Sequence, residues 1–205
     1  LMALQTSLPA GDAAELVALI ALAEELGLDD VWLGDEGPAR DPFAILAAAA
    51  QVTSRIRLGI GVTNPYIRHP ALSMAAMLTV NELSGGRAVL GVGAGGAPAL
   101  QSLQVPAPQP GPNVRRFLEV AHAVAQGRAT SGYQPADLTI RAGERPLPLY
   151  VGARGPALNR IASELADGAL VAGLPPFRYR EVIGWARSVR PIAIALYPSV
   201  AFGPE

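Results

Sequence analysis

Seven short apolar segments of this 205-residue chain alternate with helical segments almost without interruption. The apolar segments have the length of buried strands, and the segments between them carry apolar residues at helical spacing. Strands that alternate with helices in this way form parallel sheets through right-handed crossovers. The expected strands are residues 2–6, 30–33, 58–62, 88–92, 148–151, 168–172 and 192–196.

The expected helices are bounded by residues that commonly start and stop helices. Asp12, Asp41 before Pro42, and Pro70 open the first three, and Gly27 follows the first. The six expected helices span residues 12–26, 42–52, 70–84, 113–126, 156–166 and 176–187. Residues 96–112 and 127–146 are rich in proline or polar residues, so we expect surface excursions there, the second with a small hairpin around residues 138–141.

Two architectures fit this alternation. A doubly wound open sheet suits the length, because a (β/α)8 barrel typically needs about 250 residues and one more unit. Against the open sheet, no point in the chain indicates a change of winding direction. Nearly every strand also ends in a glycine or polar turn, and such a ring of loops is typical of a barrel. The last expected strand is followed by no helix, which indicates either an abbreviated barrel or a shortened chain.

Composition excludes several classes of function. Half of the residues are apolar and 16% are charged, which favours one soluble domain over residues 1–205. The formal charge of −1 and the scattered arginines argue against nucleic-acid binding. With no cysteine and two histidines, thiolate and histidine-rich metal sites are not expected. The chain also lacks lysine, which excludes Schiff-base chemistry.

The same features set the expected compartment. The first eight residues lack the basic start and long apolar stretch of a signal peptide, and the alanine-rich run at residues 45–50 is too short to cross a bilayer. Without cysteine the chain has no disulfide framework, which leaves an intracellular compartment as the default. We therefore expect a cytoplasmic protein without membrane contact.

A glycine-rich string follows the fourth expected strand. The residues Gly91, Gly93, Gly95 and Gly96 superficially match a dinucleotide fingerprint. That site needs a helix directly after the glycines and an acidic residue about 20 positions on, at the end of the next strand. Here a proline-rich segment follows, and Glu119 falls in an expected helix. A tight turn at a barrel rim and close backbone approach to a flat cofactor ring remain as the alternatives.

The turn after the fifth expected strand is a candidate phosphate site. Gly152, Ala153, Arg154 and Gly155 precede Pro156, which opens a helix. Free backbone N–H groups and a guanidinium at a positive helix end favour an anion. The alternative is an ordinary turn with a solvated arginine.

Acidic and histidine side chains supply the candidate catalytic groups. Asp35 and Glu36 follow the second expected strand, where carboxylates serve as proton carriers or, alternatively, as caps in a polar loop. His69 is a candidate base, although a histidine before proline more often enters a helix. His122 lies within a helical pattern and is expected to be structural.

Together these segments resemble the luciferase-like (bacterial luciferase) superfamily, and within it the branch that depends on coenzyme F420, typified by methylenetetrahydromethanopterin reductase. The resemblance covers residues 4–172 and is carried by TSRIRLGIGVTNPY, ELSGGR followed by LGVGAG, and YVGARGP. It implies an abbreviated TIM-like (β/α) barrel with about seven recognisable strands. Members are usually longer than this chain.

The resemblance also implies how a cofactor would be held. The Gly61-Val62 peptide would be cis and would press against one face of the deazaflavin ring, and Thr63 and Asn64 would meet its polar edge. Gly93, Ala94 and Gly95 would let backbone approach the ring, and residues 152–156 would cradle the cofactor phosphate. Asp35 stands where the family places a polar residue near the reacting centre.

On this basis we expect an oxidoreductase that transfers a hydride between coenzyme F420 and a small organic substrate. The alternatives are an FMN-dependent monooxygenase and a non-catalytic protein that binds a flavin or deazaflavin with the same loops. A homodimer is expected from the family and from the apolar edge of an incompletely closed barrel.

Overall fold

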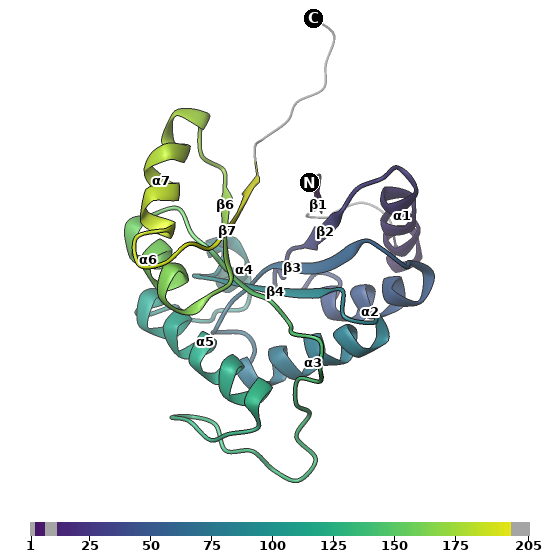
Figure 1. Ribbon diagram of the computed structural model, residues 1–205, viewed down its shortest axis with the longest axis horizontal. Coiled ribbons are helices and arrows are strands. Elements are labelled where there is room, and N and C mark those ends of the chain that lie inside the picture. The colour runs from purple at the N-terminus through teal and green to yellow at the C-terminus, as the bar shows by residue number, and fades with distance from the viewer. Residues whose placement is uncertain (1–2, 7–11, 198–205) are drawn as a thin grey trace, which may run out of the picture.

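The computed structural model describes residues 3–6 and 12–197, and its seven strands form one parallel sheet (Figure 1). The sheet order is the chain order, so each strand pairs with the next one along the sequence. The strands are β1 (Ala3–Thr6), β2 (Asp30–Leu33), β3 (Arg57–Thr63), β4 (Ala88–Gly93), β5 (Leu149–Gly152), β6 (Gly168–Ala172) and β7 (Ala193–Tyr197).

This order decides between the two predicted architectures. A doubly wound sheet reverses its strand order at a switch point, whereas here the order runs from β1 to β7 without reversal. The sheet curls with the helices on its outer side, and β1 and β7 stand at its two edges in the described part of the chain (Figure 1). The prediction of an abbreviated (β/α) barrel is confirmed.

The helices begin where the sequence predicts caps. The Asp12 side chain accepts the Glu15 N–H, and the Glu15 side chain in turn accepts the Asp12 N–H. Both backbone N–H groups at the start of α1 therefore have hydrogen-bond partners. Asp41 caps α2 and His69 caps α3. The α-helices are α1 (Ala13–Glu25), α2 (Pro42–Val52), α3 (Pro70–Leu83), α4 (Ala97–Ser102), α5 (Pro110–Gln126), α6 (Pro156–Leu165) and α7 (Tyr179–Ala186), with a 3-10 turn η1 (Pro176–Arg178) before the last.

Three local predictions were wrong. The short helix α4 lies inside the first predicted excursion, and α5 begins at Pro110 rather than at residue 113, because prolines fit the first turn of a helix. The predicted hairpin around residues 138–141 is absent, and an isolated bridge joins Thr130 to Tyr133 instead. Leu138 is 99% exposed, so no partner surface favours a strand there.

Aromatic side chains fill the interior of the curled sheet between glycines. Trp32 on β2 stands in register beside Gly59, and Tyr150 on β5 stands between Gly91 and Gly168. A Cβ at Gly59 or Gly168 would overlap the neighbouring ring. The ring of Trp32 lies 5.5 Å from that of Tyr150 and 6.5 Å from that of Tyr197, between centroids. The interior is therefore a packed core rather than a channel.

At the end of the sheet where the strands begin, charged side chains form hydrogen bonds with the backbone. The Glu24 carboxylate accepts the backbone N–H groups of Ser54, Arg55 and Ile56 at 2.6 to 2.9 Å. The Arg87 guanidinium donates to the carbonyl oxygens of Ala50 (3.2 Å), Thr53 (2.8 Å) and Ile56 (2.7 Å). These bonds satisfy backbone groups that the ends of α2 and β3 leave without partners.

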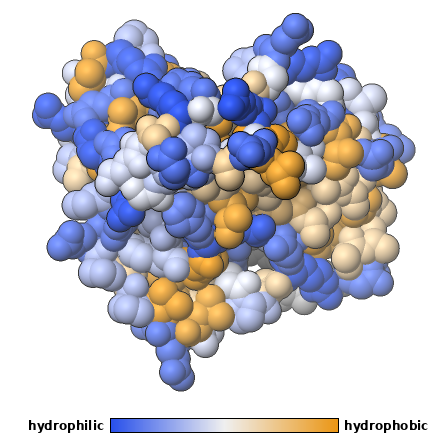
Figure 2. Space-filling view, turned by 90° about the horizontal axis from the view of Figure 1, so that it is seen from below, coloured by the Kyte–Doolittle hydropathy of each residue, from blue (hydrophilic) through white to orange (hydrophobic). Residues whose placement is uncertain are grey.

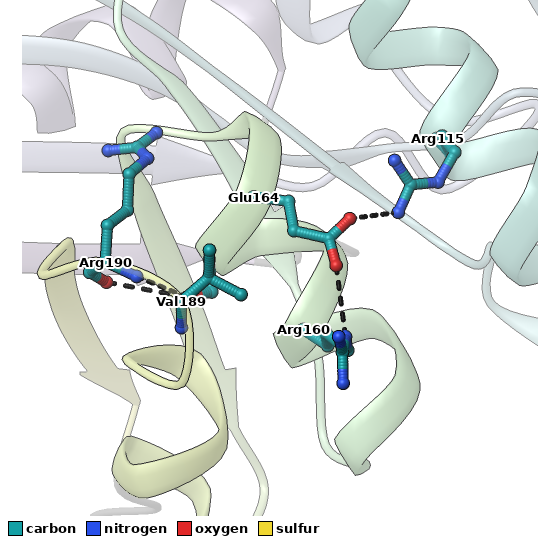
Figure 3. A network of polar contacts seen from close by, with 6 residues as sticks. Arg115, Arg160, Glu164, Val189 and Arg190 are labelled. Carbon is teal, nitrogen blue, oxygen red and sulfur yellow. Dashed lines mark hydrogen bonds and ion pairs between the residues drawn. The ribbon is translucent and has the colours of Figure 1, made fainter.

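A second polar network joins α5, α6 and the segment before β7 (Figure 3). Glu164 pairs with Arg115 of α5 and with Arg160 one turn earlier in α6. The Ser163 hydroxyl accepts the N–H groups of Val189 and Arg190. The network ties the last described unit to the rest of the molecule.

The outer faces of α2 and α3 are nearly free of charge. α2 contains no charged residue, and Glu82 is the single one in α3. Val52 and Leu72 are 58% and 60% exposed on these faces. Figure 2 shows orange and pale-orange side chains gathered toward the side on which α2 and α3 lie. Among the described residues, no helix has the length and hydropathy needed to cross a membrane.

Candidate functional site

The third strand is irregular where the sequence predicts the cofactor ring. The peptide bond between Gly61 and Val62 is cis, as the family resemblance predicts. The register of β3 on β4 shifts between Ile60 and Thr63. Val62 is half-buried, and its side chain lies across the inner face of two neighbouring strands. A Cβ at Gly93 would lie 2.8 Å from Val62 Cγ2, and one at Gly152 would lie 3.0 Å from Val62 Cγ1.

These contacts explain why β4 and β5 end in glycine. Val62 occupies the space that side chains at Gly93 and Gly152 would need, so glycine lets the three strands approach at one point. The structure thus brings together the ends of β3, β4 and β5, three of the segments predicted to form the site.

Asp35 joins this group from the loop that follows β2. Its backbone N–H donates to the Val62 carbonyl oxygen at 3.3 Å. Its carboxylate oxygen Oδ2 accepts the Thr63 hydroxyl at 2.6 Å. Burial raises the pKa of Asp35 above its ordinary value; the Thr63 hydrogen bond opposes this effect, Asp41 adds to it, and Arg68 opposes it.

Thr63 and Asn64 are buried, and an oxygen of each side chain forms hydrogen bonds within the protein. Thr63 has no exposed surface and donates to Asp35. Asn64 is 2% exposed, and its Oδ1 accepts the N–H groups of Tyr66 and Ile67, which fixes the turn after β3. A Cβ at Gly95, whose φ is +86°, would lie 3.4 Å from Asn64 Cβ, so the two turns pack together.

In the turn between β5 and α6, no side chain caps the helix and the backbone at Gly155 has free space beside it. Gly155 caps α6 without a side-chain hydrogen bond, and a Cβ there would meet no atom within 4 Å. Pro156 occupies the first turn, as predicted. Ala153 is buried and its N–H donates to Leu170 O, while the exposed Arg154 donates from Nε to Ala172 O at 2.9 Å. Arg154 therefore lies against the end of β6.

The other predicted catalytic residues lie outside this group. Glu36 is exposed and folds back beside Gly34, where a Cβ would lie 2.9 Å from its Oε1. His69 is exposed and accepts the Ala71 N–H through Nδ1 at 3.2 Å, as the cap of α3. His122 contacts Leu165 O through Nε2 at 2.8 Å, which fits its expected structural part.

Two residues beneath the site were not predicted from the sequence. Trp32 and the Tyr197 hydroxyl lie against Gly61, where a Cβ would be 2.8 Å from that hydroxyl oxygen. The hydroxyl is buried, no other described residue forms a hydrogen bond with it, and burial raises its pKa. The glycines at alternate positions of RLGIGVT are the signal that large side chains from other strands fill this space.

A cavity of about 460 Å³ lies at the other end of the sheet, beside the network of Figure 3. Glu119, His122, Arg128, Thr130 and Arg190 line it together with the end of α6. None of the predicted site residues borders it. Helices of a parallel sheet end near the strand starts, so this cavity is remote from the bulge in β3.

Comparison with known proteins agrees with this geometry. The chain is 36% identical over 168 residues to the 5,10-methylenetetrahydromethanopterin reductase of Archaeoglobus fulgidus, an alignment that covers 79% of this chain and 50% of that protein. It is 32% identical to the F420-dependent glucose-6-phosphate dehydrogenase of Beutenbergia cavernae, over 93% of this chain and 65% of the relative.

A solved structure matches with a TM-score of 0.81 and 27% identity. It is the coenzyme F420 dependent tetrahydromethanopterin reductase from Methanopyrus kandleri, and the match covers 96% of this chain and 65% of that one. The chain thus spans about half to two thirds of the length of these relatives. The model of the luciferase-like monooxygenase family matches residues 2–201, and the chain belongs to that family.

Proposed function

We propose that this protein binds coenzyme F420 and transfers a hydride between the deazaflavin and a small organic substrate. The observation that carries the proposal is the meeting of Val62 with Gly93 and Gly152 at the β3 bulge, in a chain whose relatives include F420-dependent enzymes. The likeness to the Methanopyrus kandleri reductase extends over nearly the whole chain.

The residues at the strand ends fit such a cofactor. The ring would lie against the Gly61-Val62 segment, flanked by the turn of Gly93, Ala94 and Gly95. The phosphate would bind at Gly155, where the first backbone N–H groups of α6 are open and the helix end is positive. Arg154 would add a positive charge beside it.

The bound deazaflavin would supply the hydride chemistry, and the protein would supply position and exclusion of water. Asp35 is the proposed proton-carrying group, because it is half-buried and contacts the bulge through both its backbone and its side chain. The contacts of the other two candidates favour lesser roles: Glu36 lies at the rim of the site, and His69 caps α3.

Binding is tested by titrating the purified protein with F420 and following the deazaflavin absorbance and fluorescence. We expect saturable binding that weakens several-fold in Arg154→Ala but not in Arg128→Ala, a matched control at the other end of the molecule. Tight binding of FMN instead would favour the monooxygenase alternative. Failure to bind either cofactor would overturn the proposal.

Turnover is a separate test. With F420 bound, reduction or oxidation of the cofactor is followed across a panel of small organic acceptors and donors. We expect turnover with at least one substrate and its loss in Asp35→Asn. Binding of F420 without turnover of any substrate would favour the non-catalytic alternative.

We also propose a homodimer, formed by the outer faces of α2 and α3, which carry Glu82 as their single charged residue. These neighbouring helices expose Val52, Leu72 and Leu83, apolar side chains of the kind that interfaces bury. Sedimentation velocity is expected to show a dimer for the wild type and a shift toward monomer for Leu72→Glu. Leu138→Glu, at a fully exposed loop position, is the control. A monomeric wild type would contradict the proposal.

The expected location is the cytoplasm. The absence of cysteine from all 205 residues gives no reason to place the chain in an oxidising compartment. Fractionation of cells that express the protein, with detection by antibody, tests this location.

A further inference from the structure

Asp35 is attached to β3 at two points. Its N–H donates to Val62 O at 3.3 Å, and its Oδ2 accepts the Thr63 hydroxyl at 2.6 Å. The two partners are consecutive residues on the β3 bulge. The position of the carboxylate is therefore tied to the segment proposed to contact the cofactor ring.

The direction of the hydrogen bond between Thr63 and Asp35 determines which of the two side chains can also bind a ligand. A hydroxyl has one hydrogen, and that of Thr63 is directed to Asp35. Thr63 is also completely buried, so it presents no surface to a ligand. Within the described residues, no hydrogen bond reaches Oδ1 of Asp35, which is about half-buried. The surface available to a reactant thus belongs to Asp35.

We propose that Thr63 is a positioning residue, which holds Asp35 through Oδ2 and leaves Oδ1 to accept a hydrogen bond or proton from the substrate. This inference rests on the proposed function, and it differs from the family expectation that Thr63 itself meets the ring. The hydroxyl fixes the rotamer of the carboxylate, and it favours the ionised form that accepts protons.

The charges around Asp35 agree with this arrangement. Asp41, the cap of α2, raises the pKa of Asp35, and Arg68 from the β3–α3 loop lowers it. Arg68 and Asp41 are themselves paired, with Nη1 3.4 Å from Oδ2. Arg68 is thus shared with Asp41, and the Thr63 hydroxyl is the direct contact that counters the burial of Asp35.

The test uses two substitutions at one position. Thr63→Val keeps the shape of the side chain but removes the hydroxyl, whereas Thr63→Ser keeps the hydroxyl. Titration of the Asp35 carboxyl carbon by NMR, assigned with Asp35→Asn, reads the effect without any cofactor. We expect Thr63→Val to raise the pKa of Asp35 and Thr63→Ser to leave it near the wild-type value. Thr79→Val, which removes an exposed hydroxyl from α3, is the control for the substitution type.

Turnover supplies the second readout. In Thr63→Val the acidic limb of the pH profile of kcat/KM is expected to move to higher pH, with rescue in Thr63→Ser. Circular dichroism and thermal unfolding identify a variant that fails to fold. If Thr63→Val is such a variant, the Asp35 titration and the pH profile are compared between Thr63→Ser and the wild type. Equal titration of Asp35 in the Val and Ser variants would overturn the inference.

Failure of the proposed function has a different signature. If the wild type neither binds F420 nor turns over a substrate, the function proposal falls, while the NMR titration still reports whether Thr63 controls Asp35. If turnover is intact and Thr63→Val leaves both the titration and the pH profile unchanged, the inference falls and the proposed function stands.

Discussion

At the level of single residues, the packing of the core relies on glycines that leave space for large aromatic rings on neighbouring strands. The Tyr150 ring fits because Gly168 on the neighbouring strand has no side chain, and the Tyr197 hydroxyl fits because residue 61 has none. Close packing of this kind tolerates few changes of volume. The two tyrosines differ in one respect: Arg57 interacts favourably with Tyr150, whereas the Tyr197 hydroxyl has no hydrogen-bond partner among the described residues.

Tyr197→Phe is expected to keep or raise the stability of the protein, by up to about 1 kcal/mol, because it removes a buried hydroxyl that lacks a hydrogen bond. Tyr150→Phe is the matched comparison and is expected to be destabilising, since it removes a favourable interaction with Arg57. Urea unfolding of the three proteins measures both effects. A Tyr197→Phe variant as unstable as Tyr150→Phe would contradict this reading of the core.

Gly168→Ala is expected to destabilise the fold by about 1–3 kcal/mol, because the new methyl group would overlap the Tyr150 ring. Gly184→Ala provides the control. It lies in α7, where a Cβ meets nothing within 4 Å, and alanine favours helix over glycine. Thermal unfolding should show opposite signs for the two substitutions.

At the scale of elements, the caps and the junctions between helices and strands carry the polar interactions. Most helix boundaries were predictable because Asp12, Asp41, Pro70 and Pro156 satisfy or replace the N–H groups that a helix start leaves free. The short α4 was not predictable, since six residues have little intrinsic helix stability and Leu100 holds them through contact with the site turn. The long-range bonds of Glu24 and Arg87 were equally invisible in the sequence.

Glu24→Gln is expected to lower stability at neutral pH and to matter less in acid. Burial alone would raise the pKa of Glu24, but hydrogen bonds from Ile56, Ser54 and Arg55 lower it from 4.5 to about 2. A lowered pKa stabilises the folded state above pH 4.5, and this contribution is lost as pH falls from 4.5 through about 2. Urea unfolding at pH 7 and pH 3 measures the difference between wild type and variant. An equal difference at both pH values would rule out the carboxylate as its source.

At the scale of the whole molecule, the proposed site draws on several consecutive strands. Asp35 follows β2, Val62 lies in β3, and Gly93 and Gly152 end β4 and β5. A ligand bound across them would therefore contact units that are far apart in the sequence. Ligand binding and global folding should be coupled.

Addition of F420 at about 100 times its dissociation constant is expected to raise the free energy of unfolding by about 2.7 kcal/mol. Urea unfolding with and without the cofactor measures this gain, and a small anion such as inorganic phosphate at the same concentration is the control. Because the proposed site spans β2 to β5, one cooperative transition should shift as a unit. Unchanged unfolding at saturating F420 would place binding outside the folded site.

Periodicity, helix caps and glycines act locally, so the order of the strands and helices, most element limits and the strand ends expected to bind a ligand could be predicted from the residues alone. The cis peptide at Gly61 was predictable from the family resemblance, and the structure contains it. Which side chains meet was visible only in the folded molecule: Val62 faces Gly93 and Gly152, Thr63 donates to Asp35, and Tyr197 reaches Gly61. These contacts join residues 28 to 136 positions apart, and they depend on the curvature and register of the sheet, which no local pattern encodes.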